Sequence, residues 1–115
     1  MALYNFTKEE IKKEIENKYY NLNFDYHALK STYKFDETCQ GSVPQSIFCF
    51  LISQSFEDAV RTAISLGGDA DTMACIAGSI AAAYYGIPDA IQKDAMMFLP
   101  QEFKEILNQF EERFA

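Results

Sequence analysis

The chain has 115 residues, 49% of them hydrophobic, which suits one globular domain that we place at residues 1–115. Its formal net charge of −7 repels nucleic-acid phosphates and anionic lipid surfaces, so a small molecule, a metal ion or another protein remains as a partner. The sequence has no run of about 18 apolar residues and no basic, then apolar, N-terminal segment, so we expect neither a membrane span nor secretion.

The three cysteines form no Cys-x-x-Cys pair, and their odd number argues against a disulfide framework. Cys49 and Cys75 lie within apolar stretches, which predicts that both are in the core, whereas Cys39 does not. This cysteine usage is typical of a reducing compartment, and we expect a cytoplasmic protein.

The N-terminal segment predicts a helix that begins after Thr7. Glu10 completes a capping box with Thr7, and Ile11, Ile15 and Tyr19 repeat on one face. The aromatic-rich stretch that follows has no such period. We expect it to wrap around other helices, with only a short helical turn after residue 25.

From residue 41 the helix signals are stronger. Pro44 is predicted to occupy the first position of a helix that ends near Ser53. Ser55 is then expected to cap a second helix, with Asp58 at the capping-box position, and glycines 67 and 68 to stop it.

The C-terminal half predicts three more helices. Small residues dominate positions 73–83, which favours a central buried helix rather than a surface one, ended by Gly86. Pro88 opens the next helix, Pro100 breaks it, and residues 101–114 carry a last helical period. Because no segment alternates as a strand does, the predicted fold class is all-α.

The stretch "LGGDADTM" at residues 66–73 carries the clearest chemistry. Asp69, Asp71 and Thr72 offer only hard oxygen ligands, which suit Mg²⁺, Mn²⁺ or Ca²⁺. Gly67 and Gly68 allow the backbone to approach a ligand. The alternative is structural, because either aspartate can be an ordinary helix N-cap.

The stretch "CQGSVPQS" is also ambiguous. Gly41 and Ser42 precede the expected start of a helix, where free backbone amides can bind an anion. The same pattern occurs in an ordinary entry into a helix, and by itself it favours that interpretation.

Residues 39–88, "CQGSVPQSIFCFLISQSFEDAVRTAISLGGDADTMACIAGSIAAAYYGIP", resemble the C-terminal signature of the ADP-ribosylglycohydrolase family, which includes dinitrogenase reductase activating glycohydrolase. The family has a Gly-Ser-Val-Pro-like loop, a helix pair, a Gly-Gly-Asp-x-Asp-Thr loop and an Ala/Gly-rich helix ending in Tyr-Tyr-Gly, in this order. "YKFDETCQG" also fits the approach to the first loop, whereas residues 1–30 and 89–115 resemble the family only in being helical.

The resemblance implies an all-α domain corresponding to the C-terminal half of the family fold. It also implies Mg²⁺-dependent hydrolysis of ADP-ribose conjugates at a binuclear centre, where a water attacks the anomeric carbon. By motif position, the implied metal ligands are Asp69, Asp71 and Thr72. The residues implied in substrate binding are Gly41, Ser42, Val43, Gly67 and Gly68.

Family members are typically more than twice as long, and their N-terminal half supplies a Thr-Asp-Asp metal segment that this sequence does not contain. Three interpretations follow. In the first, the chain is half of a hydrolase that is inactive alone and is completed by an N-terminal partner. In the second, it is a binding or inhibitory module that holds ADP-ribose or a protein without hydrolysis. In the third, it is a structural domain that keeps the loop as a capping device. Because half a helical domain exposes apolar surface, we also expect a homo-oligomer or a complementing chain.

Overall fold

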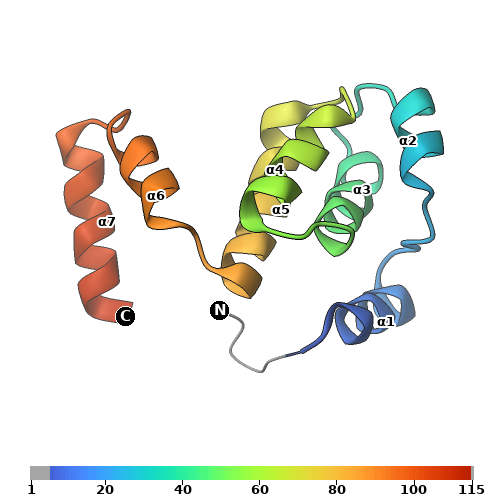
Figure 1. Ribbon diagram of the computed structural model, residues 1–115, viewed down its shortest axis with the longest axis horizontal. Coiled ribbons are helices and arrows are strands. Elements are labelled where there is room, and N and C mark those ends of the chain that lie inside the picture. Colours follow the sequence, from blue (N-terminus) through green and yellow to red (C-terminus); the bar gives the residue numbers. More distant parts are fainter. Residues whose placement is uncertain (1–5, 115) are drawn as a thin grey trace.

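The computed structural model describes residues 6–114, and within that range it contains helices and no strand. The helices are α1 (Lys8–Lys18), α2 (Tyr26–Thr32), α3 (Cys39–Leu51), α4 (Phe56–Ser65), α5 (Ala70–Tyr85), α6 (Asp89–Met96) and α7 (Gln101–Phe114) (Figure 1). The predicted all-α class is confirmed. None of these helices combines the length and the apolar character that crossing a bilayer requires.

The core lies between α3, α4 and α5. Each pair of these three helices packs more closely than any other pair of described helices. Phe50 of α3 is fully buried with Ala59 of α4 and Ala81 of α5. A second buried cluster, toward the other end of α5, includes Cys49 and Met73. Small alanines at the contacts let the three helices approach closely.

The prediction that α5 is a central buried helix is confirmed for one side of the helix only. Met73, Ala77, Gly78 and Ala81 are buried. The opposite side is exposed, because the two helices that pack most closely on α5, α3 and α4, leave that side uncovered. Cys75 lies on that exposed side, so the expectation that it belongs to the core is wrong, whereas Cys49 is buried as predicted.

Three predicted helix ends, the starts of α1 and α4 and the end of α5, are confirmed. Thr7 and Glu10 form the complete capping box of α1. Ser55 caps α4 by accepting a hydrogen bond from the backbone N–H of Asp58 at 3.1 Å. Gly86 ends α5 with φ of 79°, a conformation that other residues rarely adopt.

The predicted start of α3 at Pro44 is wrong. The helix begins at Cys39, and its N-cap is Thr38, whose Oγ1 accepts a hydrogen bond from the N–H of Gly41 at 3.1 Å. Pro44 therefore lies inside the helix. Its missing N–H removes only one hydrogen bond near the N-terminus, where the helix has been started by its cap.

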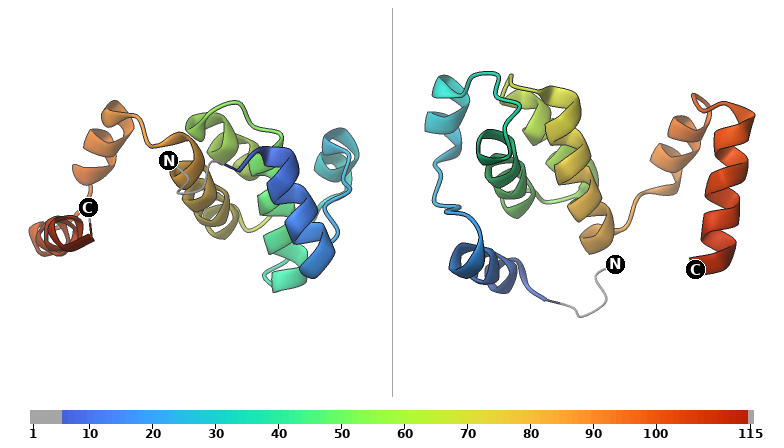
Figure 2. Two further views of the ribbon diagram at one scale, coloured as in Figure 1. Left: turned by 90° about the horizontal axis from the view of Figure 1, so that it is seen from below. Right: turned by 180° about the vertical axis from the view of Figure 1, so that it is seen from behind.

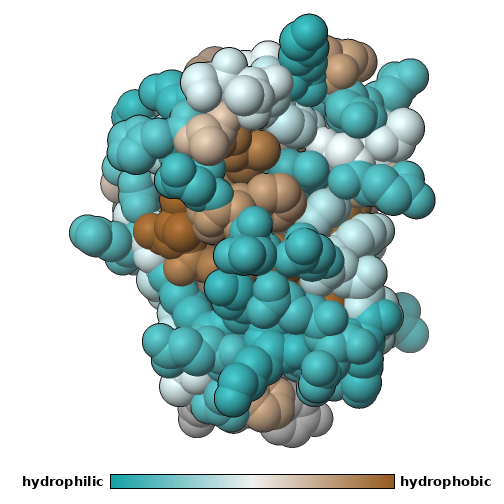
Figure 3. Space-filling model, turned by 90° about the vertical axis from the view of Figure 1, so that its right-hand side faces the viewer, coloured by the Kyte–Doolittle hydropathy of each residue, from teal (hydrophilic) through white to brown (hydrophobic). Residues whose placement is uncertain are grey.

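The C-terminal helices α6 and α7 stand apart from the three-helix core in every view (Figures 1 and 2). The radius of gyration is accordingly 15.3 Å, against about 13 Å expected for a compact chain of this length. The opposite side of the molecule, with α1 and α2, is mostly hydrophilic and carries one hydrophobic patch in its upper half (Figure 3).

Candidate functional site

The acidic loop joins the end of α4 to the start of α5. Gly67 makes the turn with φ of 76°, and Asp69 occupies the N-cap position of α5. Asp71 and Thr72 follow in the first turn of the helix, and both are exposed. The loop therefore presents its oxygen atoms at the positive end of the α5 dipole.

Asp69 does not cap the helix with its side chain, because no backbone N–H of α5 donates to its carboxylate. Its carboxyl group instead reaches that of Asp71. The pKa of Asp71 is lowered from its usual value, first by a side-chain hydrogen bond with Asp69 and then by backbone N–H groups. One of these donors is the N–H of Thr72, at 3.0 Å from Asp71 Oδ1. The structural alternative predicted a capping contact that does not form.

Two facing carboxyl groups and an adjacent hydroxyl fit a hard divalent cation in the nature of their atoms, because all are oxygen donors. They do not fit it in number, since Mg²⁺ takes six oxygen ligands. Among residues 6–114, no group of three or more His, Cys, Asp or Glu side chains is placed to hold a metal. The loop can supply one side of a metal centre.

Gly41, Ser42 and Val43 lie within α3, so the loop implied for them by the family motif is not formed. The N–H of Gly41 donates to Thr38, and the hydroxyl of Ser42 donates to the Thr38 carbonyl at 2.7 Å. Ser42 is also buried. The N–H of Gly41 and the hydroxyl of Ser42 are thus already satisfied within the helix.

Tyr33 connects the two motifs. Its hydroxyl donates a hydrogen bond to the Gly41 carbonyl, and its ring edge lies against Gly68, where a Cβ would meet Cε2 at 2.2 Å. Burial raises the pKa of the Tyr33 hydroxyl, and the carboxylates of Asp36 and Asp69 raise it further. The start of α3 and the start of α5 are therefore brought together around one aromatic ring.

Asp36 forms the outer edge of this region. Its carboxylate accepts hydrogen bonds from the Thr38 hydroxyl at 2.6 Å and the Thr38 N–H at 2.9 Å, which lower its pKa. It also lies against Gly41, where a Cβ would be 2.0 Å from Oδ2. No sequence pattern singles out Asp36 or Tyr33, although both belong to the segment that fits the approach to the first motif.

Comparison with known proteins places the whole described chain in one family. The family model for ADP-ribosylglycohydrolase matches residues 6–114, well beyond the signature at 39–88. ADP-ribosylhydrolase ARH3 of Mus musculus is 44% identical over an alignment of 71 residues, and that of Homo sapiens is 46% identical over 66. The protein of the same name from Gallus gallus is 36% identical over 87 residues.

Each match covers a large share of this chain and a small share of the relative. The matches include 50%, 45% and 64% of this chain but only 19%, 18% and 23% of the mouse, human and chicken proteins, so the chain spans about a fifth of their length. No solved structure gives a significant match. Because the family model covers nearly all of the sequence and includes the acidic loop, the chain belongs to the ADP-ribosylglycohydrolase family.

Proposed function

We propose that residues 1–115 are one domain that carries the C-terminal half of an ADP-ribosylglycohydrolase site, and that hydrolysis requires a second chain to supply the other half. The observation that carries this proposal is the orientation of Asp69. Its carboxyl group faces Asp71 although the N-cap position offers it backbone donors. Facing carboxylates repel each other unless a proton or a cation lies between them.

Asp69, Asp71 and Thr72 are the residues that would hold Mg²⁺. When bound, the ion compensates the negative charge that develops as a glycosidic bond breaks. The ligands that these three residues do not supply would come from water, substrate and the complementing chain. The exposed side of α5 supports such a chain, because Thr72, Cys75, Ser79 and Ala83 all lie on it at helical spacing with small side chains.

The substrate would be an ADP-ribose conjugate. In the reaction, a water oxygen forms a bond to the anomeric carbon, the N- or O-glycosidic bond breaks, and the leaving group takes up a proton. Gly67 and Gly68 would keep the loop close to the ribose, and Gly41 and Val43, which are both partly exposed, would line the cleft. Ser42 would act indirectly, because its hydroxyl holds the first turn of α3.

A second function remains open because the described part of the chain lacks a complete metal cluster. The domain would then hold ADP-ribose or a protein partner without hydrolysis, as a binding or inhibitory module. In either case we propose a cytoplasmic location. The three free cysteines, two of them exposed, are suited to a reducing compartment.

Calorimetric titration with Mg²⁺ and then ADP-ribose tests the ligand assignment. We expect binding to the wild type and a loss of at least ten-fold in Mg²⁺ affinity in Asp71→Ala. Asp89→Ala is the matched control, because Asp89 is an exposed aspartate in the first turn of α6. Unchanged Mg²⁺ binding in Asp71→Ala would refute the assignment. If the wild type binds no ligand and Asp71→Ala is less stable than the wild type, a structural role for the loop would be favoured.

A hydrolysis assay on an ADP-ribosylated peptide then separates the two functions. The isolated chain is expected to be inactive, and addition of a family N-terminal segment that carries Thr-Asp-Asp is expected to restore turnover. Turnover by the isolated chain would refute the half-site. ADP-ribose binding without turnover in the complemented mixture would favour the binding module.

A further inference from the structure

Lys8, the first residue of α1, places its ammonium group among aromatic rings. Its Nζ lies 5.4 Å from the ring centroid of Phe50, 5.7 Å from that of Tyr84 and 5.1 Å from that of Tyr85. It also donates a hydrogen bond to the backbone carbonyl of Ser53. We call the three rings and this carbonyl the aromatic cage.

The aromatic cage is held together by its own contacts. The rings of Phe50, Tyr84 and Tyr85 meet edge to face, with centroids 5.0–6.1 Å apart. Phe50 is fully buried in the core, and Tyr85 donates its hydroxyl to the Ser53 carbonyl at 2.8 Å. The cage therefore comes from α3, the α3–α4 connection and the last turn of α5, and it does not depend on α1 for its shape.

No carboxylate of the described residues pairs with Lys8. Among residues 6–114 the ion pairs join Lys18 to Glu14 and Arg61 to Glu57, and none includes Lys8. Its charge instead faces three ring surfaces and a carbonyl oxygen. Electron-rich ring faces attract a cation, and a carbonyl accepts one N–H of a primary ammonium group.

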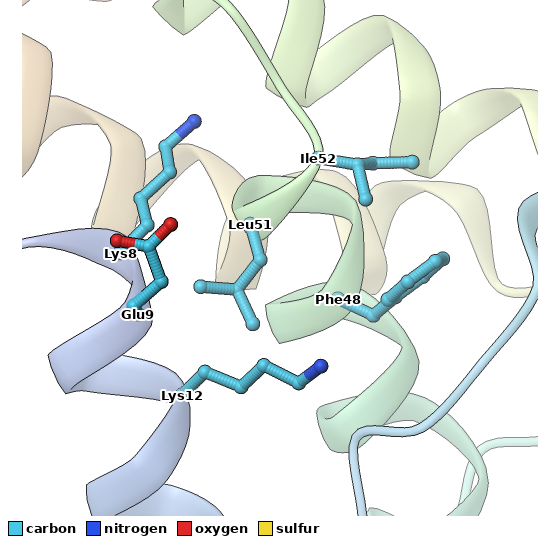
Figure 4. Close-up of a pocket in the computed structure, with 6 residues that line it drawn as sticks. All are labelled: Lys8, Glu9, Lys12, Phe48, Leu51 and Ile52. Atoms are coloured by element: carbon cyan, nitrogen blue, oxygen red, sulfur yellow. The ribbon is translucent and has the colours of Figure 1, made fainter.

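Helix α1 itself is loosely attached. None of its residues is buried, and Ile11 is the residue of α1 that packs against the cluster around Phe50. A pocket of about 260 Å³ lies between the first turns of α1 and the end of α3 with its C-cap, Ile52. Figure 4 shows Lys8 and Lys12 leaving α1 in different directions, with Leu51 between them in this view. Lys8 can therefore leave the cage without opening the core.

We propose that the aromatic cage is a binding site for a primary alkylammonium group, which Lys8 fills within the same chain. When Lys8 leaves, the site takes the end of another alkylamine. The site is separate from the acidic loop, because Tyr85 lies 14 positions after Asp71 in α5, about 21 Å along the helix. A test of the cage therefore does not depend on metal binding or on hydrolysis.

Titration with n-butylammonium chloride, followed by the aromatic NMR signals of Tyr84 and Tyr85, tests the proposal. Lys8→Ala empties the cage, and we expect it to bind the probe at least ten-fold more tightly than the wild type. Lys12→Ala removes the same charge one turn further along α1 and is expected to behave as the wild type. n-Butanol, an uncharged probe of equal length, is expected to cause only small shifts.

A second substitution identifies the rings as the site. In the Lys8→Ala background, Tyr84→Leu is expected to abolish probe binding while the helical circular dichroism signal is kept. If Lys8→Ala loses that signal, Lys8→Gln serves in its place, because glutamine removes the charge and keeps part of the aliphatic stem. Equal probe affinity in the wild type and the folded Lys8 variant, no binding to that variant, or equal shifts with n-butanol would each overturn the proposal.

Discussion

Tyr33 makes two contacts that hold the candidate site together. Its hydroxyl satisfies the Gly41 carbonyl, and its ring occupies the space beside Gly68 that any larger residue would need. Burial raises the pKa of this tyrosine and the carboxylate of Asp69 raises it further, so the ring is also near the proposed metal ligands. A single side chain outside both motifs thus fixes how the start of α3 lies beside the acidic loop.

Tyr33→Phe keeps the ring and removes the hydroxyl. We expect a loss of about 1 kcal/mol in the free energy of unfolding, because the Gly41 carbonyl loses a donor in a partly buried place. Urea unfolding measures the change. Tyr19→Phe is the control, since Tyr19 is 72% exposed and is expected to leave stability unchanged. Equal effects of the two substitutions would show that the Tyr33 hydroxyl does not stabilise this contact.

At the level of helices, the sequence predicted what depends on neighbours in the chain. The caps of α1 and α4 were found because the capping atoms lie within three residues of each other. The start of α3 was missed because Pro44 is a common first helical residue, whereas the N-cap, Thr38, lies before it in the aromatic-rich segment that shows no helical period. Asp69 and Asp71 were singled out from sequence as metal ligands, and that role stays a prediction. Tyr33 was not singled out, because its contacts appear only when separate segments meet in the fold.

The corrected start of α3 makes its own prediction. Thr38→Ala removes the cap and is expected to lower the free energy of unfolding by about 1 kcal/mol. Thr38→Ser keeps a hydroxyl at the same place and is expected to be nearly neutral. Thermal or urea unfolding compares the two variants. If alanine and serine gave the same stability, Thr38 would not be the cap, and a helix start nearer Pro44 would be favoured.

At the level of the whole molecule, apolar surface is left without cover. Helix α7 lies apart from the core (Figure 1) and has no buried residue. Five of its large apolar side chains are between 42% and 67% exposed, namely Phe103, Ile106, Leu107, Phe110 and Phe114. An apolar helix face in water favours association, because burial removes that area from water.

We therefore predict that the chain forms homodimers through α7 at micromolar concentration, as measured by light scattering. The double substitution Ile106→Gln and Phe110→Gln is expected to give a monomer, because it replaces two apolar side chains near the middle of the exposed set with polar ones. Asn108→Gln, at an exposed polar position of the same helix, is expected to leave the dimer intact. A monomeric wild type would contradict self-association, and a dimer that survives the double substitution would place the contact elsewhere, with the exposed side of α5 as the next surface to test.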